Sequence, residues 1–335
     1  MQIRALCRRL AVAFVAVLSV TAARAQTTEL KVSHFLPPNH TVSKWLENWV
    51  RELAQRSHGQ MKLDLYPAGQ LGPIQRQFDL ARNGQADVAV ALVGATPGRY
   101  PLTELTNLPF VWPSAGSTSV NMSKRATELA PKYLAGEFAG LHILWIGVGP
   151  PVSFFTGRKE IKEPQDAKGL KIRFQGELNA KLLRELGSAP LQVPPGEIVD
   201  GIGKGVIDGA LFSYEAAETY GLGTAAKFVT EPGFTSATLI LAINSKRYDS
   251  LPDDLKKLID ETTGPAAAEA LGQQWDASEH EGRAYMLQNK AKINVFTPTT
   301  IDAMKAQLKP LVENSIEALE KNGKPAREFL DAYRK

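Results

Sequence analysis

Cysteine is almost absent from this sequence, and its absence excludes several kinds of chemistry. The one cysteine, Cys7, lies close to the start of the chain and ahead of an apolar run. Beyond it the chain can form no disulfide and offers no thiol nucleophile or thiolate metal ligand. Cys7 is also badly placed for lipoprotein acylation, because an acylated cysteine would follow the apolar run.

Long apolar runs are missing as well. Residues 11–20 are apolar, but they make up only about half of the ~20 residues that a membrane-spanning helix needs. They follow three arginines and precede Ala23-Arg24-Ala25, which is the pattern of a secretory signal peptide. We expect cleavage after Ala25 and a periplasmic location for residues 26–335, with an uncleaved membrane anchor as the alternative. A chain of this length does not need disulfides for stability.

The excess of positive charge disappears once the expected signal peptide is left out of the count. The whole chain has 39 Lys and Arg against 35 Asp and Glu. Residues 1–25 contain 4 arginines and no acid, so 39 − 4 = 35 basic side chains balance 35 acidic ones in the remainder. No basic stripe with interleaved aromatics is present, and the composition gives no reason to expect nucleic-acid binding.

Catalytic and nucleotide-binding motifs are also missing. The sequence contains no G-x-S-x-G, H-E-x-x-H, P-loop or G-x-G-x-x-G pattern. No two histidines stand three or four positions apart, as a helical metal site would require (His34, His40, His58, His142, His280). We therefore expect neither catalysis nor a cofactor, with a secreted enzyme lacking a familiar motif as the alternative.

The hydrophobic pattern of the first hundred residues indicates alternating strands and helices. It predicts three strands separated by two helices, the first of them amphipathic, at residues 28–35, 40–57, 61–66, 74–83 and 86–93. The last strand is a continuous apolar run, which is typical of a buried parallel strand. This β-α-β-α-β order begins a doubly wound α/β domain.

The rest of the chain continues the α/β pattern and then becomes helical. Further strands are predicted at residues 141–146, 169–174, 191–193, 208–212 and 237–244, with a short helix at 197–203. Residues 265–289 predict one helix of about 25 residues, roughly 37 Å long at 1.5 Å per residue. That is long enough to run from one domain onto another. Apolar residues at helical spacing mark a last helix between Ile301 and Ile316.

The stretch Gly169–Phe174 points to a binding site. Its side chains alternate, so Arg173 falls on the polar face of a strand and at its carboxyl end. Ligands bind at such ends in open α/β sheets, and a guanidinium matches a carboxylate in a two-point fork. From these residues alone, Arg173 is either a surface side chain or an anchor for an anion.

Other candidate site residues follow from their positions at strand ends. Aromatic residues gather there, which favours a mainly apolar pocket, although core packing explains each one singly (Phe35, Trp112, Phe174, Phe212, Tyr214, Phe234). Three more candidates lie where strands end or loops begin (His40, Gly94, Gln192). Glu215 either accepts a hydrogen bond from a ligand hydroxyl or interacts with a helix dipole.

Several stretches, taken in order, carry a resemblance to a known family. They include KVSHFLPPNH at the start, GQADVAVA at 84–91, LPFVW at 108–112, AKGLKIRF at 167–174, VIDGALFSYEA at 206–216 and INSKRYDSLPDDLKKLIDE at 243–261. In order and spacing they resemble the DctP-type solute-binding proteins of tripartite ATP-independent periplasmic (TRAP) transporters. The resemblance covers essentially all of residues 26–335.

The resemblance implies an α/β fold of two lobes that close on a small organic anion, with a long helix bridging both. We expect a first lobe of residues 26–146 and about 235–263, and a second lobe of 147–234 and the C-terminal helices. The bridging helix would span 264–290. The resemblance also implies that Arg173 forms a salt bridge with the ligand carboxylate, and that the partners are a small organic acid and membrane permease subunits. We expect a monomer.

One departure from the family pattern bears on the ligand. Where many relatives have an acid and an asparagine, this chain has Leu211 and Phe212. Leu211 cannot ligate a cation, so we predict no metal, and Phe212 favours an aromatic or otherwise apolar monocarboxylate. The alternative is that Phe212 packs into the hinge and that Ser213 or Tyr214 makes the polar contacts. A binding protein for a sensor or an ABC permease also remains open.

Overall fold

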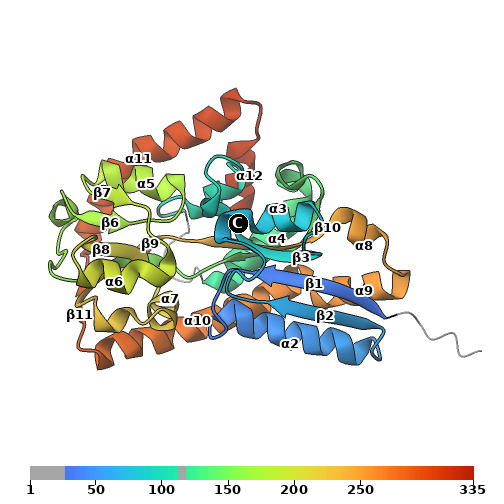
Figure 1. Ribbon diagram of the computed structural model, residues 1–335. Helices are drawn as coiled ribbons and strands as arrows, with labels where there is room; N and C mark the ends of the chain where they lie inside the picture. The colour runs from blue at the N-terminus through green and yellow to red at the C-terminus, as the bar shows by residue number, and fades with distance from the viewer. Residues whose placement is uncertain (1–26, 112–117) are drawn as a thin grey trace, which may run out of the picture.

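The computed structural model describes residues 27–111 and 118–335 and arranges them in two lobes, each built around one sheet (Figure 1). The expected signal peptide, Cys7 and Trp112 lie outside the described residues. None of the helices in the described ranges is long and apolar enough to cross a membrane. The two-lobed α/β fold predicted from the sequence is confirmed.

The first lobe contains a mixed sheet in the order β2-β1-β3-β10-β4. β1 pairs in parallel with β2 and β3, whereas β10 runs antiparallel to β3 and β4. The strands span Thr28–His34 (β1), Met61–Tyr66 (β2), Val88–Leu92 (β3), Leu141–Val148 (β4) and Thr238–Asn244 (β10). The helices are α2 (Thr41–Arg56), α3 (Gln77–Arg82), α4 (Ser119–Tyr133), α8 (Ser245–Asp249) and α9 (Asp253–Thr262). The predicted opening order of strands and helices is confirmed.

The second lobe contains a sheet in the order β11-β9-β5-β8-β6-β7. Its strands span Val152–Thr156 (β5), Lys171–Arg173 (β6), Ala189–Leu191 (β7), Gly209–Phe212 (β8), Phe228–Thr235 (β9) and Lys292–Val295 (β11). Its helices include α5 (Glu177–Glu185), α6 (Ile198–Gly203) and α7 (Tyr214–Thr219). The strand predicted at 191–193 lies two residues earlier, because Ala189 to Leu191 pair with β6.

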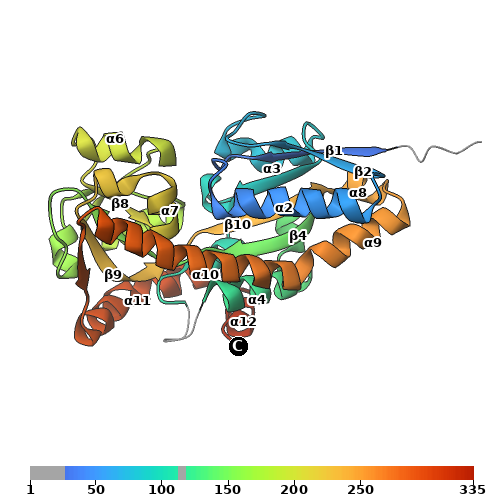
Figure 2. The same ribbon diagram turned by 90° about the horizontal axis from the view of Figure 1, so that it is seen from below.

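The lobes are joined where β4 runs into β5 and β9 runs into β10. These two crossovers lie side by side, since the Gly149 N–H donates to the Ala237 carbonyl over 2.8 Å. Helix α10 (Gly264–Gln288) then runs along both lobes, as Figure 2 shows. A glycine lies at each contact: a Cβ on Gly272 would overlap the Val120 backbone in α4, and one on Gly282 would overlap the Tyr214 carbonyl in α7.

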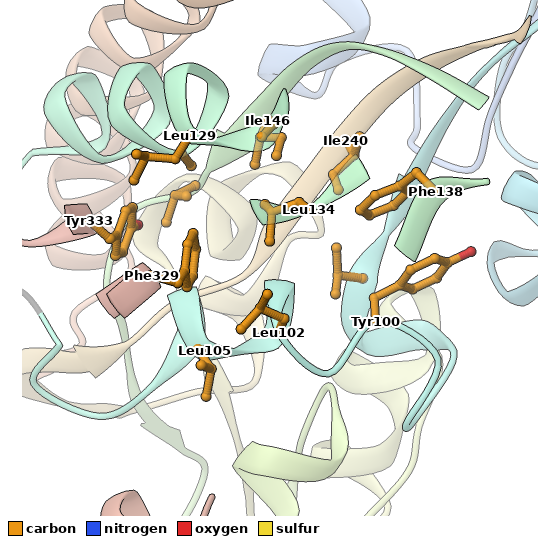
Figure 3. Close-up of a cluster of buried hydrophobic side chains, with 14 of the residues drawn as sticks. Tyr100, Leu102, Leu105, Leu129, Leu134, Phe138, Ile146, Ile240, Phe329 and Tyr333 are labelled. Atoms are coloured by element: carbon orange, nitrogen blue, oxygen red, sulfur yellow. The ribbon is translucent and has the colours of Figure 1, made fainter. Parts of the chain in front are cut away.

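The C-terminal helices contact both lobes, whereas we expected them in the second lobe alone. Helix α11 (Pro298–Lys321) packs Met304 and Leu308 into the second-lobe core but Ile316 into the first-lobe core. Helix α12 (Ala326–Tyr333) packs entirely against the first lobe, where Phe329 and Tyr333 join a buried cluster with α4 and β4 (Figure 3). The apolar face of α12 therefore contributes to the first-lobe core.

The glycine contacts of α10 predict an unusual response to substitution. Gly→Ala within a helix normally raises helix stability, but Gly282→Ala should lower the free energy of unfolding by about 1–3 kcal/mol. The new methyl would overlap the Tyr214 backbone. Gly203→Ala in α6 is the control, because nothing lies within 4 Å of its Cβ position. Urea unfolding of both variants tests this, and equal effects would contradict it.

Candidate functional site

Arg173, the last residue of β6, is buried and lacks a countercharge. The side chain is only 3% exposed, and its Nε–H donates to the Val193 carbonyl over 3.1 Å. The guanidinium carbon lies 5.3 Å from the centroid of the Phe212 ring, and Nη1 is buried without a hydrogen-bond partner. Within the described ranges Arg173 forms no ion pair, and burial lowers its pKa to about 10. Arg173 is therefore not exposed on the surface, which was one of the two possibilities left open by the alternating sequence of its strand.

The burial of Arg173 without a countercharge lowers the stability of the ligand-free protein. An uncompensated buried charge opposes folding, so buried charges are normally paired or hydrogen-bonded. Neither the Val193 carbonyl nor the face of the Phe212 ring carries a negative charge to balance the guanidinium. The arrangement is suited to an anion that supplies both a negative charge and hydrogen-bond acceptors.

A cavity lies between the two lobes, next to Arg173. Both lobes, the two crossovers and α10 contribute lining residues (Phe35, Leu36, His40, Leu92, Gly149, Pro150, Val152, Gln175, Pro195, Phe212, Ser213, Glu215, Ala216, Tyr220, Ala237, Leu239, Trp275). Its volume is about 60 Å³, and since one water needs roughly 10–15 Å³ it has room for a few water molecules. The mostly apolar lining with a few polar groups has the composition of a site for a small organic molecule, but the space is smaller than the roughly 300–1,000 Å³ of such sites, so an aromatic ring would need the lobes to move apart.

The structure brings some of the predicted site residues together at this cavity. Phe35, His40, Phe212, Ser213 and Glu215 line it. Arg173 does not line it directly but contacts Phe212, which does. Phe212 lines the cavity, and its ring centroid lies 5.3 Å from the guanidinium carbon of Arg173.

Other predicted residues lie elsewhere. The Tyr214 hydroxyl donates to Glu231 over 2.6 Å, away from the cavity, and Phe234 packs near Phe154 in the second-lobe core. Phe174 packs against the same core and Gln192 is exposed. Sequence reasoning picked these aromatics because they end strands, but it had no means of telling which face of each strand turns toward the cavity.

Tyr220 is a lining residue that the sequence analysis missed. Its ring lies 5.8 Å from that of Phe212. Burial raises the pKa of the Tyr220 hydroxyl to about 12, and the positive charge of Arg173 opposes this shift, so the two groups are close. Ala216 and Tyr220 both line the cavity and stand one helical turn apart. Because Ser213, Ala216 and Tyr220 follow one another at helical spacing, this pattern could have predicted that Tyr220 shares a face with Ser213.

The first junction between the lobes joins the start of α2 to α7. Glu215 Oε1 accepts hydrogen bonds from the Thr41 N–H (3.1 Å) and the Thr41 hydroxyl (2.8 Å). His40 Nδ1 lies 3.7 Å from the same oxygen. Glu279 of α10 holds α7 in place, since its carboxylate accepts from the N–H groups of Tyr214 and Glu215 over 3.0 and 2.9 Å. Burial raises the pKa of Glu279 to about 8.

The second junction is a contact between glycine backbones. A Cβ on Gly94, directly after β3, would lie 2.8 Å from the Gly176 Cα at the start of α5. Gly94 was expected to bind ligand; it lies instead where the lobes touch. Glu104 faces the same junction, with Oε1 buried and without a hydrogen-bond partner. Burial, with repulsion from Glu137, raises the pKa of Glu104 to about 7.

The predicted absence of a metal is not tested by this structure, but the residues can be described. In the ranges that the structure covers, no three His, Cys, Asp or Glu side chains gather as a metal site would require. Leu211 is fully buried in the second-lobe core.

Comparison with known proteins places this geometry in a family. A family model described as bacterial extracellular solute-binding protein, family 7 (DctP), matches residues 32–319. The chain also resembles solved TRAP solute-binding proteins. One from Rhodoferax ferrireducens contains copurified benzoate and is 29% identical, with a TM-score of 0.87 over 92% of this chain and 97% of that one.

Two more solved structures are similarly close. A marine metagenome TRAP protein, specific for aromatic acid ligands and crystallised with 3-hydroxybenzoate, is 26% identical, with a TM-score of 0.86 over 92% of this chain and 97% of that one. A TRAP periplasmic protein from Bordetella bronchiseptica with bound (R)- and (S)-mandelate is 28% identical, with a TM-score of 0.84 over 92% and 98% of the two chains.

The buried Glu104 predicts a pH dependence of stability. Its folded-state pKa of about 7 lies above the ordinary 4.5, so the folded state holds a proton that the unfolded state has lost between these values. Stability should therefore fall as pH rises through this window. Glu104→Gln should raise the free energy of unfolding by about 1–3 kcal/mol at pH 8 and hardly change it at pH 4.

The control for this prediction is Glu47→Gln, because Glu47 is an exposed acid of α2 that does not face Glu104. It should leave the pH dependence unchanged. Glu137, Lys181 and Glu177 face Glu104 and stay in place in both variants. A Glu104→Gln effect of equal size at both pH values, measured by urea unfolding, would contradict the prediction.

The unpaired charge of Arg173 gives a second prediction. Arg173→Met removes the charge and keeps an apolar chain, so the free energy of unfolding of the ligand-free protein should be unchanged or higher by up to about 2 kcal/mol. Arg283→Met is the control, since Arg283 is paired with Glu231 over 2.7 Å and its loss should destabilise. The proteins are refolded first to remove copurified acid. A loss of several kcal/mol in Arg173→Met would show that the charge is already balanced.

Proposed function

The chain belongs to the DctP family of bacterial extracellular solute-binding proteins, the binding subunits of TRAP transporters, and we propose that it captures an aromatic monocarboxylate in the periplasm for a TRAP membrane permease. The observation that carries this proposal is Arg173, a buried guanidinium with no countercharge beside a small interlobe cavity. A carboxylate would supply the missing charge.

The proposed contacts of the carboxylate follow from the free donors near Arg173. Nη1 lacks a partner, and the Tyr220 hydroxyl has none among the described residues. Charge-assisted hydrogen bonds of this kind contribute about 1.5–3 kcal/mol each. One carboxylate would satisfy these donors. No Lys or Arg of the described ranges lines the cavity to pair with the second carboxylate of a dicarboxylate.

The rest of the cavity favours an aromatic ring over a sugar. Phe35, Phe212 and Trp275 line it together with aliphatic side chains, whereas sugar acids need polar partners for several hydroxyls. The three similar structures with benzoate, 3-hydroxybenzoate and mandelate bind aromatic acids. These relatives support the same ligand class here.

Lobe closure would be coupled to binding. A ligand shifts an open-to-closed equilibrium only through contacts that it gains in the closed state. Arg173 and Phe212 belong to the second lobe, while Phe35 and His40 belong to the first, so a ligand in the cavity contacts both. The proposed role is capture and delivery without chemical change, and the ligand is expected to leave intact.

Thermal-shift and calorimetric screening of residues 26–335 against organic acids tests the proposal. An aromatic monocarboxylate at 100 times its Kd should stabilise the protein by about 2.7 kcal/mol. Arg173→Met should lose this response, and Arg173→Lys should retain a fraction of it, because an ammonium keeps the charge but loses the fork.

Two controls ask whether the ligand's charge is needed and whether the ligand stays intact. Matched amides of the same acids should not bind, because they lack the charge. The acid recovered after long incubation should be unchanged, as a hydrolase or other enzyme would alter it. Stronger responses to C4-dicarboxylates or uronic acids would overturn the ligand class, and responses to amides equal to those of the acids would overturn the role of Arg173.

A further inference from the structure

We propose that His40 and Glu215 form a hydroxyl-binding subsite, so that the preferred ligand is an aromatic acid carrying a hydroxyl group apart from its carboxylate. This inference rests on the proposed function and adds a substrate class to it. The two side chains come from different lobes, both line the cavity, and both are about nineteen-twentieths buried, at 6% and 5% exposure.

His40 supplies the hydrogen-bond donor of this subsite. Its Nδ1 accepts a hydrogen bond from the Val42 N–H over 3.1 Å, so in the neutral imidazole the proton is on Nε2. Burial lowers the pKa of His40, which keeps the ring neutral near pH 7. Within the described part of the chain Nε2 has no partner, so a donor is left for a ligand.

Glu215 supplies the acceptor. Its Oε1 already accepts two hydrogen bonds from Thr41, whereas Oε2 accepts none from the residues that the structure describes. The position of Glu215 is fixed because Glu279 accepts from its backbone N–H over 2.9 Å. The carboxylate is therefore held at the cavity with one oxygen available.

A donor and an acceptor on the walls of one cavity match a hydroxyl better than other polar groups. A hydroxyl donates one hydrogen bond and accepts others, so it satisfies both His40 and Glu215. An amino group would place its N–H donors against the N–H donor of His40, and a ketone would place an acceptor against the carboxylate acceptor of Glu215. An acid without a polar group there leaves both partners unsatisfied when the lobes exclude water, and sites of this kind reject the deoxygenated analogue strongly.

Calorimetry with matched ligand pairs tests the subsite. Phenylacetate and benzoate are compared with their ortho-, meta- and para-hydroxy forms, and with the corresponding amino forms. The best hydroxy isomer should bind about 10- to 100-fold more tightly than its parent and than its amino analogue. The ratio of the two Kd values is the readout, because a general loss of affinity leaves it unchanged.

Two variants and one control test whether His40 and Glu215 cause the preference for the hydroxy acid over its parent. Glu215→Gln keeps an acceptor for Thr41, and His40→Asn keeps a side-chain acceptor for the Val42 N–H. Each should reduce the hydroxyl preference to less than about 5-fold. Thr41→Val removes the hydrogen bonds of the hydroxyl to Glu215 and to Ser278 but keeps the bond from the Thr41 N–H to Glu215, so it should weaken all acids alike and preserve the ratio.

The outcomes distinguish this inference from the proposed function. If parent and hydroxy acids bind the native protein equally, the subsite is wrong and the aromatic-acid proposal stands. If the preference exists but survives in both variants, His40 and Glu215 are not its source. If no aromatic acid binds the native protein, the proposed function fails and the subsite fails with it.

Discussion

The unbalanced charge of Arg173 is the constraint on which the rest of the site depends. A guanidinium buried beside an aromatic ring is unfavourable until a negative charge joins it. The sheet keeps it there, because β6 pairs with β7 and β8 on both sides and fixes the backbone of Arg173 opposite Leu191 and Ala210. The protein thus carries a buried charge that lowers its stability, and in the proposed function the carboxylate of the ligand would balance this charge.

The two junctions define how closely the lobes approach one another. On one side a polar contact joins Thr41 to Glu215, and on the other the backbones of Gly94 and Gly176 meet without side chains between them. The cavity lies where both lobes contribute walls. In the proposed site, the backbone positions at the two junctions would limit the size of the ligand, and a few polar side chains would select its chemistry.

Much of this fold could be predicted from the sequence, and the failures have physical reasons. The first strands and α10 follow from periodicity and from the scarcity of helix breakers between 265 and 289. Strand β9 was missed because it contains Pro232 and Gly233, which usually interrupt strands; the register of β9 with β5 shifts to accommodate them. The location of Arg173 was predicted from the end of its strand. The junction of Thr41 with Glu215 was not, because the two residues are 174 positions apart and no local pattern connects them.

The path of α11 has a consequence for how the molecule opens. This helix enters the second-lobe core with Leu308 and the first-lobe core with Ile316, so it ties the lobes together at a distance from the crossovers and from α10. Because the lobes are connected on separate faces, by the crossovers, by α10 and by α11, few directions remain in which one lobe can move relative to the other. An open form would consequently be restricted in conformation, and closure would remove little further disorder. More of the interaction energy would then appear as affinity, which suits the capture of a ligand too small to make many contacts.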